Sequence, residues 1–202
     1  MSDRYRLMVP VTVPPLLIAA VGLSHPSPLT VEMAEHWQLI HTILLFLFPL
    51  VALGPWLVAR RGSPAAAVVV GVVAYVYATA YTALDVLAGI AGGAIKAAEA
   101  GGLGIIFPVA ANFELVGGVA LVLASALSVG IVSRALGWWV VPGGVLVIAS
   151  AWLHWQAHVY PPRGVLSMVG LAAGWGLLAW QLTRPGVAAR DVARRDRTVT
   201  TD

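Results

Sequence analysis

Long apolar runs alternate with short polar or basic breaks along most of the chain. A helix needs about 20 predominantly apolar residues to cross roughly 30 Å of hydrocarbon at ~1.5 Å per residue. Runs of about this length cover residues 7–24, 38–59, 64–91, 104–132, 138–158 and 164–183. The pattern predicts an all-α polytopic membrane protein with six transmembrane helices. We expect one transmembrane helical domain over residues 1–184 and a charged cytoplasmic tail over 185–202.

Composition supports a membrane protein and excludes several kinds of chemistry. The chain has 202 residues, of which 59% are hydrophobic and only 10% are charged, whereas soluble domains carry about 25% charged residues. Because cysteine is absent, disulfides, thiolate metal ligands and cysteine nucleophiles are excluded. The net charge of +3 does not predict a nucleic-acid partner, because the basic residues gather at the ends of apolar runs.

The basic residues also predict the orientation of the chain in the plasma membrane. If the N-terminus is cytoplasmic, most of the twelve basic residues fall in the inner segments, and only Lys96 and Arg163 lie outside. This positive-inside bias predicts that both termini are cytoplasmic. It also predicts that every histidine lies toward the extracytoplasmic side: His25, His36, His41, His154 and His158.

Two carboxylates interrupt apolar helices on that same side. A charged carboxylate near the centre of a bilayer costs about 2.5–3.5 kcal/mol, so it needs a partner, a proton or a water-filled cavity. Counting along the helices at ~1.5 Å per residue places Asp85 near the outer surface and Glu114 on the order of 15 Å below it. Tyr81 precedes Asp85 by four residues and is expected to share its helix face.

The spacing of two histidines predicts a metal site between helices. His154 and His158 stand at i and i+4, where they share one helix face and can bind the same ion. His41, Asp85 and Glu114 come from three other helices at a similar depth. Imidazole and carboxylate ligands without thiolate suit Zn or Fe, and also Cu(II) or Mn, better than Cu(I).

The remaining histidines leave alternatives open. His36 and His41 are five residues apart, about 140° around an ideal helix, so both point inward only if the helix begins after Trp37. His25 begins a His-Pro-Ser-Pro stretch, which is either a source of another ligand or a rigid turn that covers the site.

Each candidate also has a purely structural interpretation. His154 and His158 can cap a helix at the interface, where aromatic belts lie. Asp85 can accept hydrogen bonds from backbone amides or from Tyr81, and Glu114 can be a protonated acid bonded to a neighbouring helix.

The order of His41, Asp85, His154 and His158 along the chain loosely resembles the alkaline ceramidase and adiponectin-receptor superfamily of membrane zinc hydrolases. The resemblance implies that the three histidines bind zinc and that the aspartate assists a water molecule. That family has seven helices whereas this chain offers six, and Trp37 occupies the position of its Ser-x-x-x-His serine. The match covers four residues and is an analogy rather than membership.

Together these residues favour an integral membrane metal-binding protein that is a metalloenzyme, either a hydrolase or an oxidoreductase. Its substrate is expected to be lipid-soluble or a small molecule at the extracytoplasmic face. Glu114, Asp85 and Tyr81 are expected to handle protons, and the expected metal ligands are His36, His41, Asp85, Glu114, His154 and His158.

Two other functions are compatible with the sequence. One is a haem b protein in electron transfer, with one axial histidine from each of two facing helices. The other is a metal or proton transporter, which ranks last because the inner half of the helices carries neither acid nor histidine.

Overall fold

The computed structural model describes residues 3–185, and its regular structure in that range is entirely helical. The tail predicted over 185–202 therefore lies outside the described residues from 186 onward. The elements are α1 (Asp3–Gly22), α2 (Ala34–Val51), α3 (Leu53–Gly62), α4 (Pro64–Leu84), the π-helix η1 (Asp85–Ala91), α5 (Gly92–Ala97), α6 (Leu103–Leu136), the 3-10 turn η2 (Gly137–Trp139), α7 (Val140–Ala157) and α8 (Arg163–Leu182).

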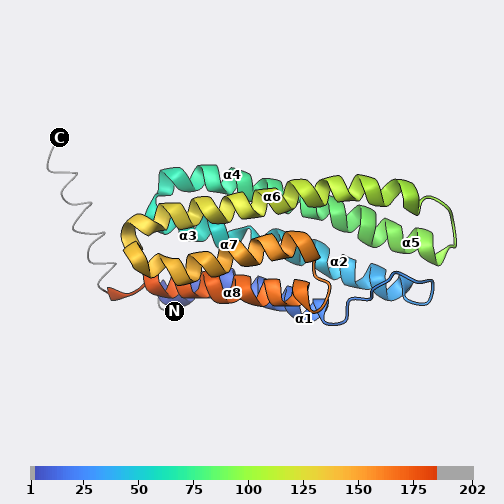
Figure 1. The fold of residues 1–202 in the computed structure, drawn as a ribbon, viewed down its shortest axis with the longest axis horizontal. Helices are drawn as coiled ribbons and strands as arrows, with labels where there is room; N and C mark the ends of the chain where they lie inside the picture. The colour runs from blue at the N-terminus through green and yellow to red at the C-terminus, as the bar shows by residue number, and fades with distance from the viewer. Residues whose placement is uncertain (1–2, 186–202) are drawn as a thin grey trace.

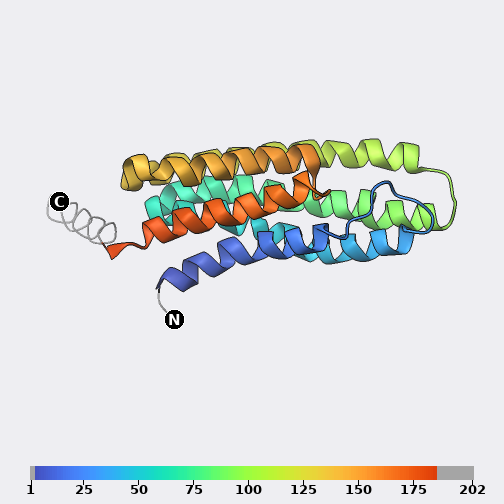
Figure 2. The ribbon, with the colours of Figure 1, turned by 60° about the horizontal axis from the view of Figure 1, so that its bottom comes forward.

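The helices lie lengthwise beside one another in an elongated bundle (Figures 1 and 2). α6 packs against α4 and α7, and α8 packs against α1 and α7. α7, α8 and α1 end well before α2, α5 and α6, which form the right-hand end of Figure 1 together with their connecting loops. The bundle therefore has a step, where the α7–α8 turn lies and from which the α1–α2 loop runs to the right-hand end.

Residues 3–185 contain five helical stretches that are long and apolar enough to cross a membrane. They are Asp3–Gly22, Ala34–Gly62, Pro64–Ala97, Leu103–Ala157 and Arg163–Leu182. The all-α prediction is thus confirmed, with five such stretches where six were predicted. The difference arises because helical structure continues from α6 through η2 into α7 without a non-helical residue, although the chain turns back there and α6 and α7 lie side by side (Figure 1).

Proline and serine explain two boundaries near the basic end. Pro55 has no N–H to donate to the carbonyl of Val51, and α2 ends at Val51. Ser63 then ends α3 and caps α4, because its hydroxyl accepts a hydrogen bond from the Ala66 N–H at 3.2 Å. Pro64 occupies the first helical position, where a missing N–H costs nothing.

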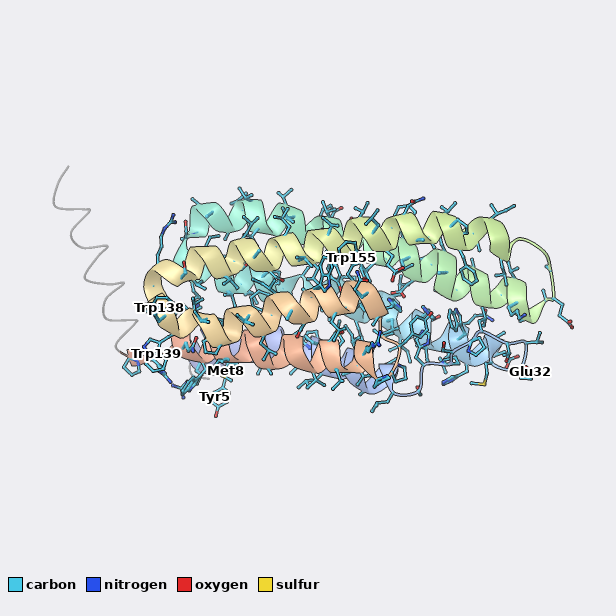
Figure 3. The ribbon with its side chains drawn as sticks, viewed as in Figure 1. Tyr5, Met8, Glu32, Trp138, Trp139 and Trp155 are labelled. Atoms are coloured by element: carbon cyan, nitrogen blue, oxygen red, sulfur yellow. The ribbon has the colours of Figure 1, made fainter. Side chains whose placement is uncertain are left out.

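Basic and tryptophan residues gather at one end of the bundle. Arg61 forms an ion pair with Asp3 at 2.7 Å, which joins the end of α3 to the start of α1. Figure 3 shows Trp138 and Trp139 at this same end and Glu32 at the opposite end. Arginine and tryptophan side chains therefore lie together at this end of the bundle.

Candidate metal centre

Three buried imidazoles meet at the step in the bundle. His25 lies in the α1–α2 loop, His41 lies in α2, and His158 is the residue that directly follows α7. Each offers a ring nitrogen, and these three nitrogens all lie within 4.8 Å of one another. The side chains are only 4%, 3% and 6% exposed, so the cluster is shielded from solvent and sits where a metal ion could be held.

Backbone carbonyls fix the orientation of two of these rings. Nδ1 of His25 donates to the Pro26 carbonyl at 2.9 Å, and Nδ1 of His41 donates to the Trp37 carbonyl at 2.8 Å. Because a carbonyl only accepts, each Nδ1 carries the proton and each Nε2 of the neutral ring presents a lone pair. Such bonds are typical of metal-binding histidines, in which the ring nitrogen that does not bind the metal donates its N–H to a carbonyl. This hydrogen bond fixes the tautomer of the ring.

The two lone pairs face each other. Nε2 of His25 and Nε2 of His41 are 3.5 Å apart, and two lone pairs cannot form a hydrogen bond. A tetrahedral ion with metal–nitrogen distances of ~2.0–2.1 Å holds its nitrogen ligands about 3.3–3.4 Å apart. The observed separation fits that value. Burial lowers the pKa of His25 and so favours the neutral ring that this arrangement requires.

His158 reaches the cluster because it has left the helix. α7 ends at Ala157, and His158 has φ +47°, in the left-handed region. Gly164 makes the tight turn possible, since a Cβ there would overlap the backbone of His158 and Val159. Burial, with smaller contributions from the neighbouring histidines, lowers the pKa of His158 well below its ordinary value. Its Nδ1 is buried without a hydrogen-bond partner, so no protein group competes for it.

The π-helix η1 holds His41 from the other side. Gly89 packs directly on His41, and a Cβ at Gly89 would overlap the imidazole. The Trp37 Nε1–H donates to the Ala88 carbonyl at 3.0 Å. π-helical turns are rare and often occur at functional sites. Here η1 allows α2 to approach closely enough to place His41 in the cluster.

A cavity of about 310 Å³ lies beside the histidines. His41 and His158 form part of its wall, together with the half-buried carboxylate of Glu114. The Tyr160 phenol also faces it, and burial, with a smaller effect of Glu114, raises the pKa of Tyr160 to about 12. The other lining residues are Leu29, Trp37, Leu84, Ala88, Phe107, Ala110 and Ala111.

A second set of buried polar side chains includes His154 and Tyr81, whose rings pack against His158. The His154 ring stacks on Tyr81 with centroids 4.9 Å apart, and its Nδ1 donates to the His158 carbonyl at 3.0 Å. Nε2 of His154, the hydroxyl of Tyr81 and both oxygens of Asp85 are buried without hydrogen-bond partners. An unpaired buried polar group costs about 1–3 kcal/mol. These buried atoms therefore lack the partners that buried polar groups normally have, which makes them candidates for a functional role.

The structure gathers some of the predicted ligands and separates others. His41 and His158 lie in the three-histidine cluster, and Glu114 faces the cavity beside it. His154 lies outside the cluster and bonds the His158 backbone. His36 also lies outside, and its Nε2 donates to the Ser24 carbonyl at 2.9 Å. Asp85 does not line the cavity and is fully buried.

His25 is the cluster residue that the sequence did not assign as a ligand. Its place in a proline-rich loop gave no helix face and no depth from which to position it. The loop itself was the available signal, because prolines on both sides of Ser27 restrict a segment that begins with a histidine.

Comparisons with protein-family models, with curated proteins and with solved structures find no match to this chain.

Proposed function

We propose that this chain is an integral membrane metalloenzyme in which His25, His41 and His158 bind one ion, Zn or Fe. The observation that carries the proposal is the pair of Nε2 atoms, of His25 and His41, that face each other at 3.5 Å while both Nδ1 atoms bond carbonyls. A cation is the partner that satisfies facing lone pairs on neutral imidazoles. The third ring, on His158, must move by at most about 1.5 Å to complete a tetrahedral set.

Three protein ligands leave the fourth position of a tetrahedral ion open, which is the pattern of catalytic rather than structural sites. The adjacent cavity supplies space for a water molecule or a substrate there. Glu114 is the proposed proton acceptor, because it is the carboxylate that faces this cavity. Asp85 and Tyr81, whose buried oxygens lack partners, are the proposed next holders of that proton. Hydrolysis and oxidation are both compatible with this ligand set.

The proposed topology has six crossings, with α6 and α7 each spanning the bilayer. α7 has 18 residues, about 27 Å at helical rise, which is close to the hydrocarbon thickness. The turn at η2 lies with Trp138 and Trp139 at the arginine-rich end (Figure 3). Taking that end as cytoplasmic places both termini inside and the histidines near the extracytoplasmic face of the plasma membrane.

We do not propose the haem alternative. A porphyrin between His41 and His158 would need the space that the His25 ring fills, with centroids 5.0 and 6.1 Å from the other two rings. Transport is not proposed either, since no buried acid or histidine extends the polar groups through the inner half of the described bundle.

The decisive measurement is the metal content and absorption spectrum of protein purified without chelator or nickel resin. We expect about one Zn or Fe per chain and no Soret band. His25→Ala and His41→Ala should each lose the metal, whereas His36→Ala is the matched control, because His36 bonds the Ser24 carbonyl and lies outside the cluster. Wild-type protein that takes up no metal, or a His25→Ala protein that keeps it all, would refute the proposal.

A further inference from the structure

One face of α6 forms a long wall of the cavity. Phe107, Ala110, Ala111 and Glu114 all line it, at the i, i+3, i+4 and i+7 spacing of a single helix face. Immediately beyond Glu114 the helix is covered, because Tyr81 packs on Gly117 and Trp155 packs on the next residue. Figure 3 shows Trp155 between α6 and α7. The cavity therefore ends near Glu114 and extends along α6 toward Phe107.

The polar groups gather at the closed end. Trp155 packs on Gly118, and α6 and α7 run antiparallel. Glu114 lies one turn before Gly118, and His158 follows the end of α7 about one turn after Trp155, so His158 is level with Glu114. Tyr160 also lines the cavity, together with Glu114, His41 and His158.

The rest of the cavity wall consists mostly of apolar side chains. The only side-chain N–H of Trp37 donates to the Ala88 carbonyl, so Trp37 contributes only apolar ring surface to the cavity wall. Ala110 and Ala111 leave room beside α6, and Phe107 lies at the far end. The cavity is thus polar at one end and apolar along its length.

We propose that this cavity binds a short-chain amphiphile, with a metal-binding oxygen head between the histidines and Glu114 and a hydrocarbon chain along Ala110 and Ala111. This inference rests on the proposed metal site. A volume of about 310 Å³ accommodates roughly ten non-hydrogen atoms at ~30 Å³ each, so the head leaves space for about six to eight carbons. Ala111 determines the accepted chain length, because it lines the cavity and is itself exposed.

Straight-chain alkyl hydroxamates test this directly, because their two oxygens chelate a divalent ion and their chain length can be varied. The protein is loaded with Co(II), and binding is followed by the change in its visible absorption bands in one fixed detergent. In wild type we expect affinity to rise about three- to fourfold per added methylene up to about six to eight carbons and then to level off.

Two alanine substitutions provide the matched comparison. Ala111→Phe fills the cavity, and its affinity gain should stop several carbons earlier, with a loss of at least tenfold for the octyl probe. Ala94→Phe makes the same change at an exposed residue of α5 that does not line the cavity, and it should behave like wild type. Partition of the probes into detergent is identical for all three proteins, so it cancels in the comparison.

The outcomes separate the two proposals. Wild-type protein that binds no Co(II) would refute the metal site and this inference with it. Protein that binds Co(II) but shows the same chain-length profile for Ala111→Phe and Ala94→Phe would refute only the amphiphile site. A profile shortened in Ala111→Phe alone, with unchanged Co(II) content in both variants, supports it.

Discussion

Gly89→Ala should displace His41 from the proposed metal centre without replacing any ligand. Gly89 lies within η1 and has no positive φ, so alanine fits the local backbone and even raises helix propensity by about 1 kcal/mol. The added Cβ, however, would overlap Cβ, Cγ and Cδ2 of His41. Rotation of the ring does not move Cβ, so α2 and η1 must shift apart, which separates Nε2 of His41 from that of His25.

The size of the effect follows from the share of binding free energy that one ligand carries. Structural zinc sites bind with about 10–16 kcal/mol over four ligands, or roughly 2.5–4 kcal/mol per ligand if the shares are equal. Losing one ligand then weakens binding roughly 60- to 700-fold. Forcing a methyl group into a packed contact also lowers the free energy of unfolding by about 1–3 kcal/mol, so stability must be measured separately.

Gly92→Ala is the matched control. It makes the same change three residues farther along, where the new Cβ would meet Phe107 at 3.1 Å and contact no histidine. Zinc affinity is measured for wild type and both variants by competition with a chromogenic chelator in detergent, and stability by thermal melting followed by circular dichroism. Zinc binding by Gly89→Ala within threefold of wild type, or an equal loss of affinity in both variants, would contradict this prediction.

Three further substitutions test the supports of the site and the bundle. His154→Ala should weaken zinc binding about 10- to 100-fold, less than His158→Ala, because His154 only bonds the backbone carbonyl of His158. Equal losses of zinc affinity in the same competition assay would make His154 a ligand. Gly164→Ala should lower both zinc affinity and melting temperature, because its Cβ would displace the turn that presents His158; unchanged values would show that the turn adapts. Ser128→Ala should lower the free energy of unfolding by about 0.5–1.5 kcal/mol and leave zinc affinity unchanged, because its hydroxyl donates at 2.7 Å to a carbonyl of α3. Ser133→Ala is the control, because its hydroxyl bonds the Gly130 carbonyl of its own helix, and equal denaturation midpoints would contradict the assignment.

The helices were predictable because hydrocarbon length and helical rise leave few solutions for long apolar runs. The run at 104–132 corresponds to α6, which extends to Leu136. The run at 38–59 proved to be two elements, since Pro55 interrupts the hydrogen-bond ladder. Apolar pattern reports burial and length, but it does not report such local breaks.

The site was predictable only where helix geometry fixed it. His41, predicted as a ligand from its depth along its helix, lies in the three-histidine cluster. The spacing of His154 and His158 predicts a shared face only if one helix continues through both, whereas α7 ends at Ala157. The two rings still stack, with centroids 6.1 Å apart, but His154 bonds the His158 carbonyl and lies outside the three-histidine cluster. His25 lies in a loop, for which spacing along the chain predicts no direction.

The three rings also differ in how they are held, which bears on how the site would assemble. His25 and His41 each bond a carbonyl of their own segment, one and four residues away, so local structure alone orients them. His158 has no such bond from its ring, and its place depends on the carbonyl bond from His154 and on the turn before α8. Two of the proposed ligands are therefore fixed in advance, and the third depends on the packing of α7 against α8. Since α8 also packs on α1, which leads into the loop that carries His25, a bound ion would join both sides of the step and stabilise the bundle as a whole.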